Sequence, residues 1–354
     1  MSRFLSSKHA SLAPYTPGEQ PRDMKYIKLN TNESPFPPSP KAQQYAADEA
    51  KLLQLYSDPE CTLLRQKFAA LAGVSPEEVL PVNGSDEILN FAFMAFGDQD
   101  HPAVFPDITY GFYPVFAQLN AVPYREIPLK DDFSIDLNEY KGHKGLIVIA
   151  NPNAPTGMAI PAKEIEDLIA ASPEAVVVID EAYVDFGGES CIPLIRKYDN
   201  LLVTQTFSKS RSMAGARLGF GIACRELIAD LNAIKYATNP YNVNRMTAAA
   251  GVGSIEHEAY TQANCRTIIE NREWTACELK KLGFDVLPSC ANFLFVRHST
   301  LNGGETYTKL RKNGILVRHF SKPRLDEFNR ITIGTMEQMQ AVVNALKQQL
   351  EAKQ

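Results

Sequence analysis

The stretch TQTFSKSRSMAGARLGF, from Thr204 to Phe220, places a lysine directly after a hydrophobic run. Lys209 follows Ser208, and Arg217 comes eight residues later among small residues. A solvated basic helix face is one interpretation of this pattern. However, a lysine at the end of a buried strand is costly to keep charged, and its amine is the group that forms Schiff bases with carbonyl compounds. The alternative interpretation is that Lys209 forms a Schiff base, and this requires suitable partner groups at the ends of neighbouring strands.

Two other hydrophobic runs end in groups that suit such a site. The run VVVID ends in Asp180, and the run LIVIANP leads into the tight turn NPNAPTG. A carboxylate is needed where a cofactor carries a ring nitrogen that must stay protonated. Because ligands of α/β sheets bind beyond the carboxyl ends of the strands, we expect Asp180, Lys209 and the turn to lie close together.

An anion site is predicted from the stretch VLPVNGSDEILNFAFMAF, which has the pattern of a strand, a Gly84-Ser85-Asp turn and a helix. The first N–H groups of a helix point outward and bind anions. Ser208 and Arg217 could donate to the same anion, since the arginine fork binds two oxygens. A ring nitrogen, a carbonyl and a phosphate together describe pyridoxal 5′-phosphate, which is therefore the predicted cofactor.

The elements that must position these residues alternate between short apolar runs and helical segments. The runs are HPAVFP, GLIVIANP, AVVVIDEAY, NLLVTQTFS and RLGFGIA. Continuous apolar runs are typical of a parallel sheet covered by helices on both faces. We therefore predict an α/β fold, with a large cofactor-binding domain at 46–240. Residues 1–45 and 241–354 are expected to form a smaller α+β domain, with a long helical stretch from about Met246 to Lys281.

Composition excludes several classes of protein. The net charge is −5 and no basic stretch dominates, so a nucleic-acid partner is not expected. No apolar run is long enough to span a bilayer, and the first residues lack the apolar region of a signal peptide. The six cysteines form no CxxC pair, which indicates reduced thiols, a cytoplasmic location and no metal site. No strand is followed by GxGxxG, which disfavours a dinucleotide-binding dehydrogenase.

Eight further motifs occur in a fixed order along the chain: LNTNESPFPP, YSDPE, NGSDEIL, DITYGFY, NPNAPTG, DEAYVDF, PYNVN and RITIG. Together with TFSKSRSMAGARLG they closely resemble the class-II pyridoxal-phosphate aminotransferases of fold type I, and within them the histidinol-phosphate aminotransferase family. The resemblance covers nearly the whole chain. It implies a ping-pong transfer of the amino group from histidinol phosphate to 2-oxoglutarate, giving imidazole acetol phosphate and glutamate in histidine biosynthesis.

The resemblance also implies roles for matching residues. Lys209 would bind the cofactor as a Schiff base and carry the proton, and Asp180 would pair with the pyridine nitrogen. Tyr110 would stack on the ring, and Tyr183 would hydrogen-bond the ring hydroxyl.

Phosphate and substrate contacts follow from the same resemblance. The phosphate would be held by residues of three motifs, with a tyrosine reaching in from the second subunit of a homodimer: Gly84, Ser85, Ser208, Arg217 and Tyr56. Arg330 would bind the anionic end of the substrate, a small-molecule amino donor or keto acceptor. Further substrate contacts are expected from Arg318, Asn32 and Tyr15.

One departure from the family pattern concerns the ring hydroxyl. The family commonly has an asparagine directly before Pro-Thr-Gly, and this chain has Ala154 there, with Asn153 one residue upstream. Either Tyr183 acts alone or Asn153 substitutes. Two alternative activities share these motifs, namely a threonine-phosphate decarboxylase and an aromatic amino-acid aminotransferase. A non-catalytic pyridoxal-phosphate sensor that reads DNA is disfavoured by the acidic charge.

Overall fold

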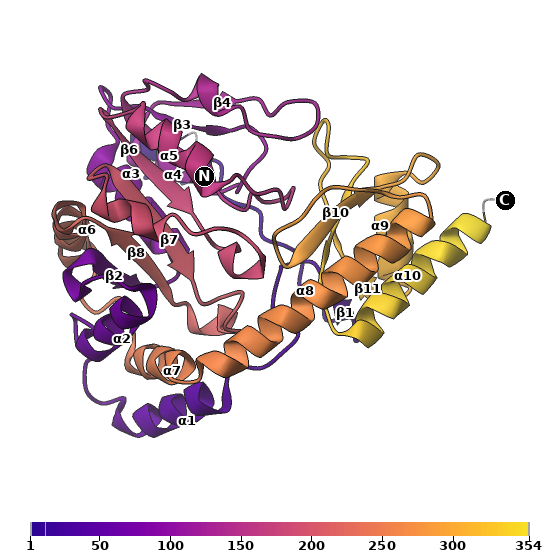
Figure 1. The fold of residues 1–354 in the computed structure, drawn as a ribbon, viewed down its shortest axis with the longest axis horizontal. Helices are drawn as coiled ribbons and strands as arrows, with labels where there is room; N and C mark the ends of the chain where they lie inside the picture. The colour runs from indigo at the N-terminus through magenta and orange to yellow at the C-terminus, as the bar shows by residue number, and fades with distance from the viewer. Residues whose placement is uncertain (1, 11, 353–354) are drawn as a thin grey trace.

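A computed structural model of the chain describes residues 2–10 and 12–352. Its largest feature is a seven-stranded sheet, which can be followed in Figure 1. The strand order across the sheet is β2 (Val79–Val82), β8 (Gly219–Ala223), β7 (Leu201–Thr206), β6 (Ala175–Asp180), β5 (Gly145–Ala150), β3 (Ala103–Pro106) and β4 (Tyr124–Ile127). The pairs from β7 through β6, β5 and β3 to β4 are parallel. Only β8 runs antiparallel to both of its neighbours. The prediction of a mostly parallel sheet is confirmed.

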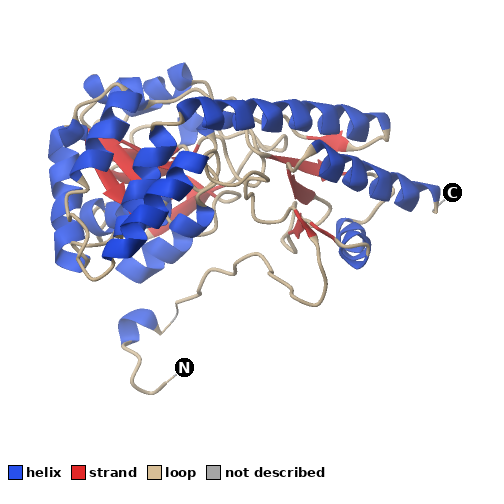
Figure 2. Ribbon diagram, turned by 90° about the horizontal axis from the view of Figure 1, so that it is seen from below, coloured by secondary structure: helices blue, strands red, loops and turns tan. Residues whose placement is uncertain are grey.

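Helices cover both faces of this sheet, as Figure 2 shows. The covering helices are α2 (Thr62–Ala72), α3 (Ser85–Phe96), α4 (Tyr113–Asn120), α5 (Ala162–Ala170) and α6 (Arg225–Thr238). Val178 and Ile179 follow each other in β6, yet they belong to two different clusters of buried apolar side chains. Successive strand residues point to opposite faces, so a run without alternation is required when both faces are buried.

A smaller layer is built around the four-stranded antiparallel sheet β12 (Arg318–His319), β13 (Asn329–Thr332), β10 (Phe293–Arg297) and β9 (Asp285–Val286). Three helices pack on it, namely α8 (Glu258–Lys281), α9 (Gly303–Lys312) and α10 (Met336–Glu351). Their Leu279, Leu310 and Met339 join Leu294 and Ile331 of the sheet in one apolar cluster. Beside it, β1 (Ile27–Lys28) pairs in parallel with β11 (Ile315–Leu316). The N-terminal segment is therefore joined to the C-terminal part of the chain.

The helical stretch expected from Met246 to Lys281 is two helices. α7 (Arg245–Ile255) ends before Glu256, and α8 begins at Glu258. Glu256 forms ion pairs with Lys41 of α1 (Pro40–Glu49) and Lys67 of α2, which hold the chain at this corner. α1 and α7 pack on each other, and both contribute to the cluster under the large sheet. The domain boundaries at 46 and 240 stay a prediction.

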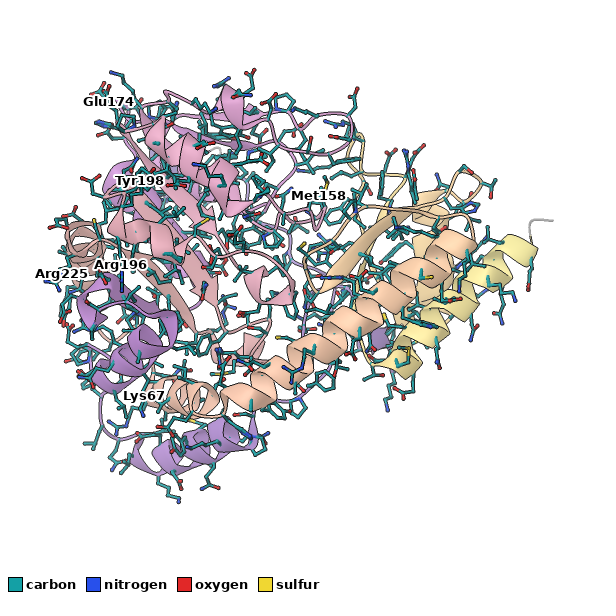
Figure 3. The ribbon with its side chains drawn as sticks, viewed as in Figure 1. Lys67, Met158, Glu174, Arg196, Tyr198 and Arg225 are labelled. Carbon is teal, nitrogen blue, oxygen red and sulfur yellow. The ribbon has the colours of Figure 1, made fainter. Side chains whose placement is uncertain are left out.

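One apolar cluster joins the two layers. Leu129 and Phe133 from the large sheet's side pack with Phe295 and Phe328 from the smaller sheet's side. Met158 packs against this cluster, and Figure 3 labels it between the two layers. Among the described residues, no helix is long and apolar enough to cross a membrane.

Residues 12–26 form an arm without helix or strand, seen in Figure 2 as a loop outside the layers. Tyr15 stacks on Phe112 with 4.3 Å between ring centroids. Further along, the Asn30 side chain donates to the Glu19 carbonyl at 2.8 Å. The arm thus runs from the large sheet's helices toward β1.

Gly219 provides a test of the packing between β8 and the start of α3. A Cβ at this position would lie 2.5 Å from the backbone nitrogen of Ser85 and 2.6 Å from the carbonyl carbon of Gly84. We expect Gly219→Ala to lower the free energy of unfolding by about 1–3 kcal/mol, because backbone must move to admit the methyl group. Urea unfolding of the cofactor-free protein measures this loss.

Gly215→Ala is the matched control. A Cβ there meets no heavy atom within 4 Å. We expect a change of less than about 0.5 kcal/mol. Equal losses for the two variants would contradict the packing argument.

Candidate active site

A cavity of about 150 Å³ lies beyond the carboxyl ends of β5, β6 and β7. This is the edge of the sheet where the strand-end residues were expected to meet. Seven of the predicted residues line it: Ser85, Tyr110, Asp180, Tyr183, Ser208, Lys209 and Arg217. The structure therefore brings together residues that are more than a hundred positions apart in the sequence.

Asp180 is the last residue of β6 and is buried. The Tyr113 hydroxyl donates to its Oδ2 at 2.9 Å, and the Ala182 backbone N–H donates to its Oδ1 at 3.2 Å. Burial raises the pKa of Asp180 to about 6, although the hydrogen bond from Tyr113 opposes the rise. Within the described chain, no lysine or arginine forms an ion pair with this carboxylate. It is suited to accept a proton-bearing nitrogen from a ligand.

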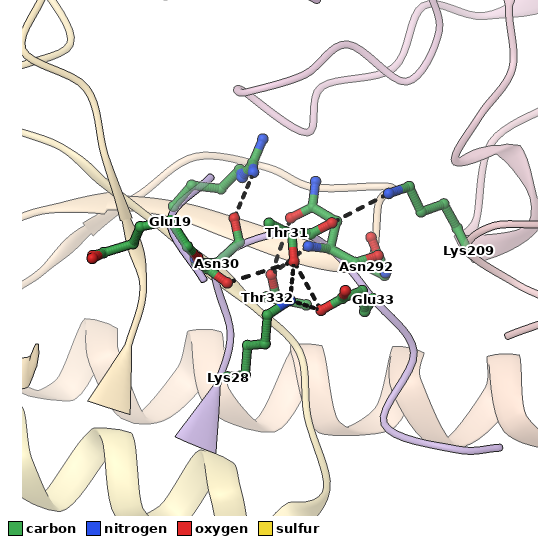
Figure 4. A network of polar contacts seen from close by, with 10 residues as sticks. Glu19, Lys28, Asn30, Thr31, Glu33, Lys209, Asn292 and Thr332 are labelled. Atoms are coloured by element: carbon green, nitrogen blue, oxygen red, sulfur yellow. Dashed lines mark hydrogen bonds and ion pairs between the residues drawn. The ribbon is translucent and has the colours of Figure 1, made fainter. Parts of the chain in front are cut away.

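Lys209 follows β7 and projects toward the N-terminal segment. Its Nζ donates to the Thr31 carbonyl at 3.2 Å, a contact drawn in Figure 4. The same atom lies 5.9 Å from the centroid of the Tyr183 ring. Burial and then the charge of Arg330 lower the pKa of Lys209 to about 8. A sizeable share of the amine is therefore neutral near pH 8, as a nucleophile or proton acceptor must be.

An anion-binding corner lies at the start of α3. Ser85 is the first residue of that helix, where N–H groups have no partner within the helix. Arg217 reaches the same corner, with its Nη2 atom 2.8 Å from Asp86 Oδ2. A Cβ on Gly84 would lie 2.5 Å from that Nη2 atom, and Gly84 has φ +81°. The positive φ favours glycine at this turn, and a larger residue would also displace the Arg217 guanidinium.

Asp86 is a member of the site that the sequence analysis missed. Its other oxygen accepts a hydrogen bond from the Tyr110 hydroxyl at 2.7 Å. Asp86 thus holds Arg217 and Tyr110 on either side of the cavity. Tyr113 was missed as well, although it lies three residues after Tyr110 in the DITYGFY motif. Its ring meets that of Tyr110 edge-on at 81°.

A larger cavity of about 530 Å³ adjoins the first and shares Tyr110, Tyr183 and Lys209 with it. The four predicted substrate residues line this second space: Tyr15, Asn32, Arg318 and Arg330. Arg330 Nη2 donates to the Asn30 carbonyl at 3.0 Å, while its buried Nε has no partner among the described residues. Arg330 therefore has donor capacity left for an anion.

Tyr56 does not line either cavity of the single chain. It is 80% exposed and stacks on Tyr241 with 4.6 Å between ring centroids. Its predicted role depends on a second subunit and stays a prediction.

The place of the ring-hydroxyl asparagine is taken by Ala154, which lines the first cavity. Asn153 is buried, and its amide is engaged elsewhere. It donates to the Ile108 carbonyl at 3.0 Å and to Thr156 Oγ1 at 3.2 Å, and it accepts from Thr109 Oγ1 at 2.8 Å. Asn153 is therefore not free to substitute for the missing side chain.

These groups fit pyridoxal 5′-phosphate. The anion corner suits a phosphate, the unpaired carboxylate of Asp180 suits a protonated ring nitrogen, and the amine of Lys209 suits an aldehyde. The described residues hold no group of three or more His, Cys, Asp or Glu side chains that could bind a metal ion.

Comparison with known proteins agrees with this chemistry. A family model described as aminotransferase class I and II matches residues 24–346. A histidinol-phosphate aminotransferase of Acinetobacter baumannii (strain AYE) is 49% identical over 352 residues, which are 98% of each chain. Histidinol-phosphate aminotransferase 1 of Bradyrhizobium diazoefficiens is 47% identical over 348 residues, covering 98% of this chain and 99% of its own.

Solved structures share the fold. The histidinol-phosphate aminotransferase of Sinorhizobium meliloti in complex with pyridoxal-5′-phosphate has a TM-score of 0.84 at 23% identity, covering 93% of this chain and 92% of its own. L-threonine-O-3-phosphate decarboxylase of Porphyromonas gingivalis has a TM-score of 0.79 at 22% identity, covering 92% and 99%. The fold alone therefore does not separate the two activities.

The chain belongs to the class I and II aminotransferases, a family that depends on pyridoxal phosphate. The predictions of a fold-type-I architecture, a transferase activity and this cofactor are confirmed. The assignment of individual residues to roles stays a prediction.

The hydrogen bond between Tyr113 and Asp180 can be tested through pH. The folded-state pKa of Asp180 lies above its ordinary value, so the stability it contributes is present below 3.8 and lost as pH rises through about 6. Tyr113→Phe removes a donor to the charged carboxylate. We expect losses in unfolding free energy of about 1.5–3 kcal/mol at pH 8 but only about 0.5–1.5 kcal/mol at pH 4.5. Denaturant unfolding of the cofactor-free protein at both pH values gives the comparison.

Tyr140→Phe is the control, because Tyr140 is equally buried and its hydroxyl has no partner in the described structure. Its effect should be small and independent of pH. A loss for Tyr113→Phe that is the same at both pH values would show that the hydroxyl does not act on the Asp180 charge.

Proposed function

We propose that this chain is a histidinol-phosphate aminotransferase that passes an amino group from histidinol phosphate to 2-oxoglutarate in histidine biosynthesis. The observation that carries the proposal is the 49% identity over 98% of both chains to a protein of that name. Two arginines in the larger cavity, Arg318 and Arg330, support a substrate with an anionic end. Such a cavity suits both the phosphate of one substrate and the carboxylates of the other.

The residues of the first cavity have distinct tasks in this proposal. When bound, pyridoxal phosphate supplies an aldehyde and an electron-withdrawing ring. Lys209 would hold the cofactor at its aldehyde carbon. Once the amino group of the substrate has taken its place there, the freed Lys209 amine would move a proton at the reacting carbon of the substrate. Asp180 accepts the N–H of the ring nitrogen and keeps it protonated. Ser85, Ser208 and Arg217 hold the phosphate.

The remaining contacts orient the reactants. Tyr110 packs on the ring face, fixed by its bond to Asp86, and Tyr183 donates to the ring hydroxyl. Arg330 binds the anionic end of the substrate. Arg318 lies 3.4 Å from the carbonyls of Thr16 and Pro17, so it also holds the arm that carries Tyr15. A cytoplasmic location is part of the proposal.

The substrate is tested by following each half-reaction separately. We expect histidinol phosphate to convert the bound cofactor faster than phenylalanine does in stopped-flow absorbance, and threonine phosphate to release no carbon dioxide. Lys209→Ala should keep the cofactor through its phosphate contacts but lose turnover. Borohydride reduction of the parent enzyme followed by peptide mapping should label Lys209.

Faster reaction with phenylalanine would move the assignment to an aromatic aminotransferase. Release of carbon dioxide from threonine phosphate would move it to a decarboxylase. A borohydride label on another lysine would refute the role of Lys209.

We also propose a homodimer in which Tyr56 of each subunit reaches the phosphate of the other. Tyr56 is 80% exposed, and nearby Leu53 and Leu55 are 58% and 55% exposed. Large apolar side chains grouped on a surface favour burial against a partner. The proposed contact explains why Tyr56 lines neither of the two cavities around Lys209 in its own chain.

Mixing two inactive variants tests the shared site. Lys209→Ala and Tyr56→Ala subunits should together form heterodimers in which one of the two sites is complete. We expect about a quarter of the parental activity after exchange, since half of randomly mixed dimers are heterodimers. Each variant alone is the control, and sedimentation measures the assembly state. A monomer at assay concentration, or no recovery despite heterodimer formation, would exclude the shared site.

A further inference from the structure

Asn32 lines the larger cavity, between Thr31 and Glu33 of the first cavity, and has an unusual backbone conformation. Its φ is +56°, in the left-handed region where asparagine is tolerated better than most residues. The residue is 1% exposed. Such a conformation persists only when the surrounding structure determines it, and residues held this way cluster at functional sites.

Four hydrogen bonds fix Asn32, and three of them come from the smaller layer. Its backbone N–H donates to Thr332 Oγ1 at 3.0 Å, and that hydroxyl lies 3.0 Å from Asn32 Oδ1. Asn292 Nδ2 donates to the Asn32 carbonyl at 3.0 Å. Figure 4 shows Asn292 and Thr332 beside the segment that includes Thr31. The conformation of Asn32 is thus set by β13 and by the residue before β10.

The fourth bond points the other way, into the site. Asn32 Nδ2 donates to the Tyr183 hydroxyl at 2.9 Å. The residue before it, Thr31, presents its carbonyl to the amine of Lys209 at 3.2 Å. Asn32 therefore lies between the smaller layer and two groups that face the cofactor cavity.

We propose that Asn32 is a positioning residue with two actions: its side-chain amide orients the Tyr183 hydroxyl, and its left-handed backbone aims the Thr31 carbonyl at the Lys209 amine. Tyr183 receives its amide donor from the N-terminal segment, because Asn32 Nδ2 lies 2.9 Å from its hydroxyl. The inference rests on the proposed function only in that Tyr183 and Lys209 contact the cofactor. It does not depend on which amino donor is used.

The two actions separate in two substitutions. Asn32→Gly removes the amide but keeps the left-handed backbone without strain, whereas Asn32→Ala removes the amide and disfavours the backbone conformation. Neither variant alters the charged groups around the Lys209 amine or the Tyr183 hydroxyl. Those that act on Lys209 are Arg330, Glu33, Asp86 and Arg217, and those that act on Tyr183 are Arg330, Asp180 and Asp86.

The first readout is the absorbance of the bound cofactor in the loaded, substrate-free protein as pH is varied. Without the amide, the Tyr183 hydroxyl becomes a weaker donor to the ring oxygen, so the anionic form of that oxygen is less favoured. Both variants should move the titration midpoint upward by about half a pH unit.

The second readout uses the cofactor-free protein and measures how fast Lys209 is acetylated at limiting reagent, by peptide mass mapping. Losing the Thr31 carbonyl removes an acceptor for the charged amine, so more of the amine is neutral. Asn32→Ala should speed acetylation by about threefold at neutral pH, the change that half a pKa unit produces. Asn32→Gly should match the parent protein.

Asn30→Ala is the matched control, since Asn30 is equally buried in the same segment and its side chain bonds the Glu19 carbonyl. It should move neither readout. Thr332→Val removes the hydroxyl that bonds both the backbone N–H and the Oδ1 of Asn32. We expect it to shift the absorbance midpoint upward, and it provides a second test if Asn32→Ala does not fold.

Midpoints that stay at the parental value in Asn32→Gly and Thr332→Val would overturn the action on Tyr183. Equal acetylation rates in the glycine and alanine variants would overturn the action on Lys209. A parent enzyme that rejects histidinol phosphate while these shifts occur would refute only the proposed substrate.

Discussion

A carboxylate buried without a cationic partner is the constraint on which the rest of the site depends. Asp180 ends a strand whose two faces are covered, so no water-exposed position is available to it. Removing a carboxylate from water has a penalty of several kcal/mol, which only donors close to the oxygens can offset. The chain supplies two, Tyr113 and the Ala182 N–H. A ligand that brings a charged N–H adds the donor that is missing, so cofactor binding should also stabilise the fold.

The next residue, Glu181, is a buried acid whose hydrogen bonds are all made within the protein, in contrast to Asp180, which faces the cavity. Glu181 is also buried, and burial raises its pKa to about 7. Its oxygens are met by Ser190 Oγ at 2.7 Å, the Cys191 N–H at 2.5 Å and Gln205 Nε2 at 2.9 Å. Glu181 lines neither cavity around Lys209. The chain thus encloses one acid with its own donors and leaves the other facing the cavity.

The sequence predicted the parts of the site that depend on strand ends, because the carboxyl ends of parallel strands meet at one edge. Lys209 and Asp180 were found in this way. Asp86 and Tyr113 were not, since their partners depend on how α3 and α4 are rotated against the sheet. The break between α7 and α8 has neither glycine nor proline, and it is marked by the tertiary ion pairs of Glu256. The antiparallel direction of β8 was not predicted either, because a buried antiparallel strand has the same continuous apolar sequence as a buried parallel strand.

The side of the site that is proposed to bind the substrate is made from the most distant parts of the chain. Asn32 and Thr332, which bond each other, are 300 residues apart, and the Arg330 guanidinium bonds the carbonyl of Asn30. By contrast, Ser85, Asp180 and Lys209 lie on or directly beside one sheet and its helices. Under the proposed function, substitutions in the arm or the smaller layer would therefore alter substrate binding without touching the residues at the strand ends. The threonine-phosphate decarboxylase shares this fold with a TM-score of 0.79 at 22% identity. The fold therefore determines neither the reaction nor the substrate, and both depend on the individual side chains of the site.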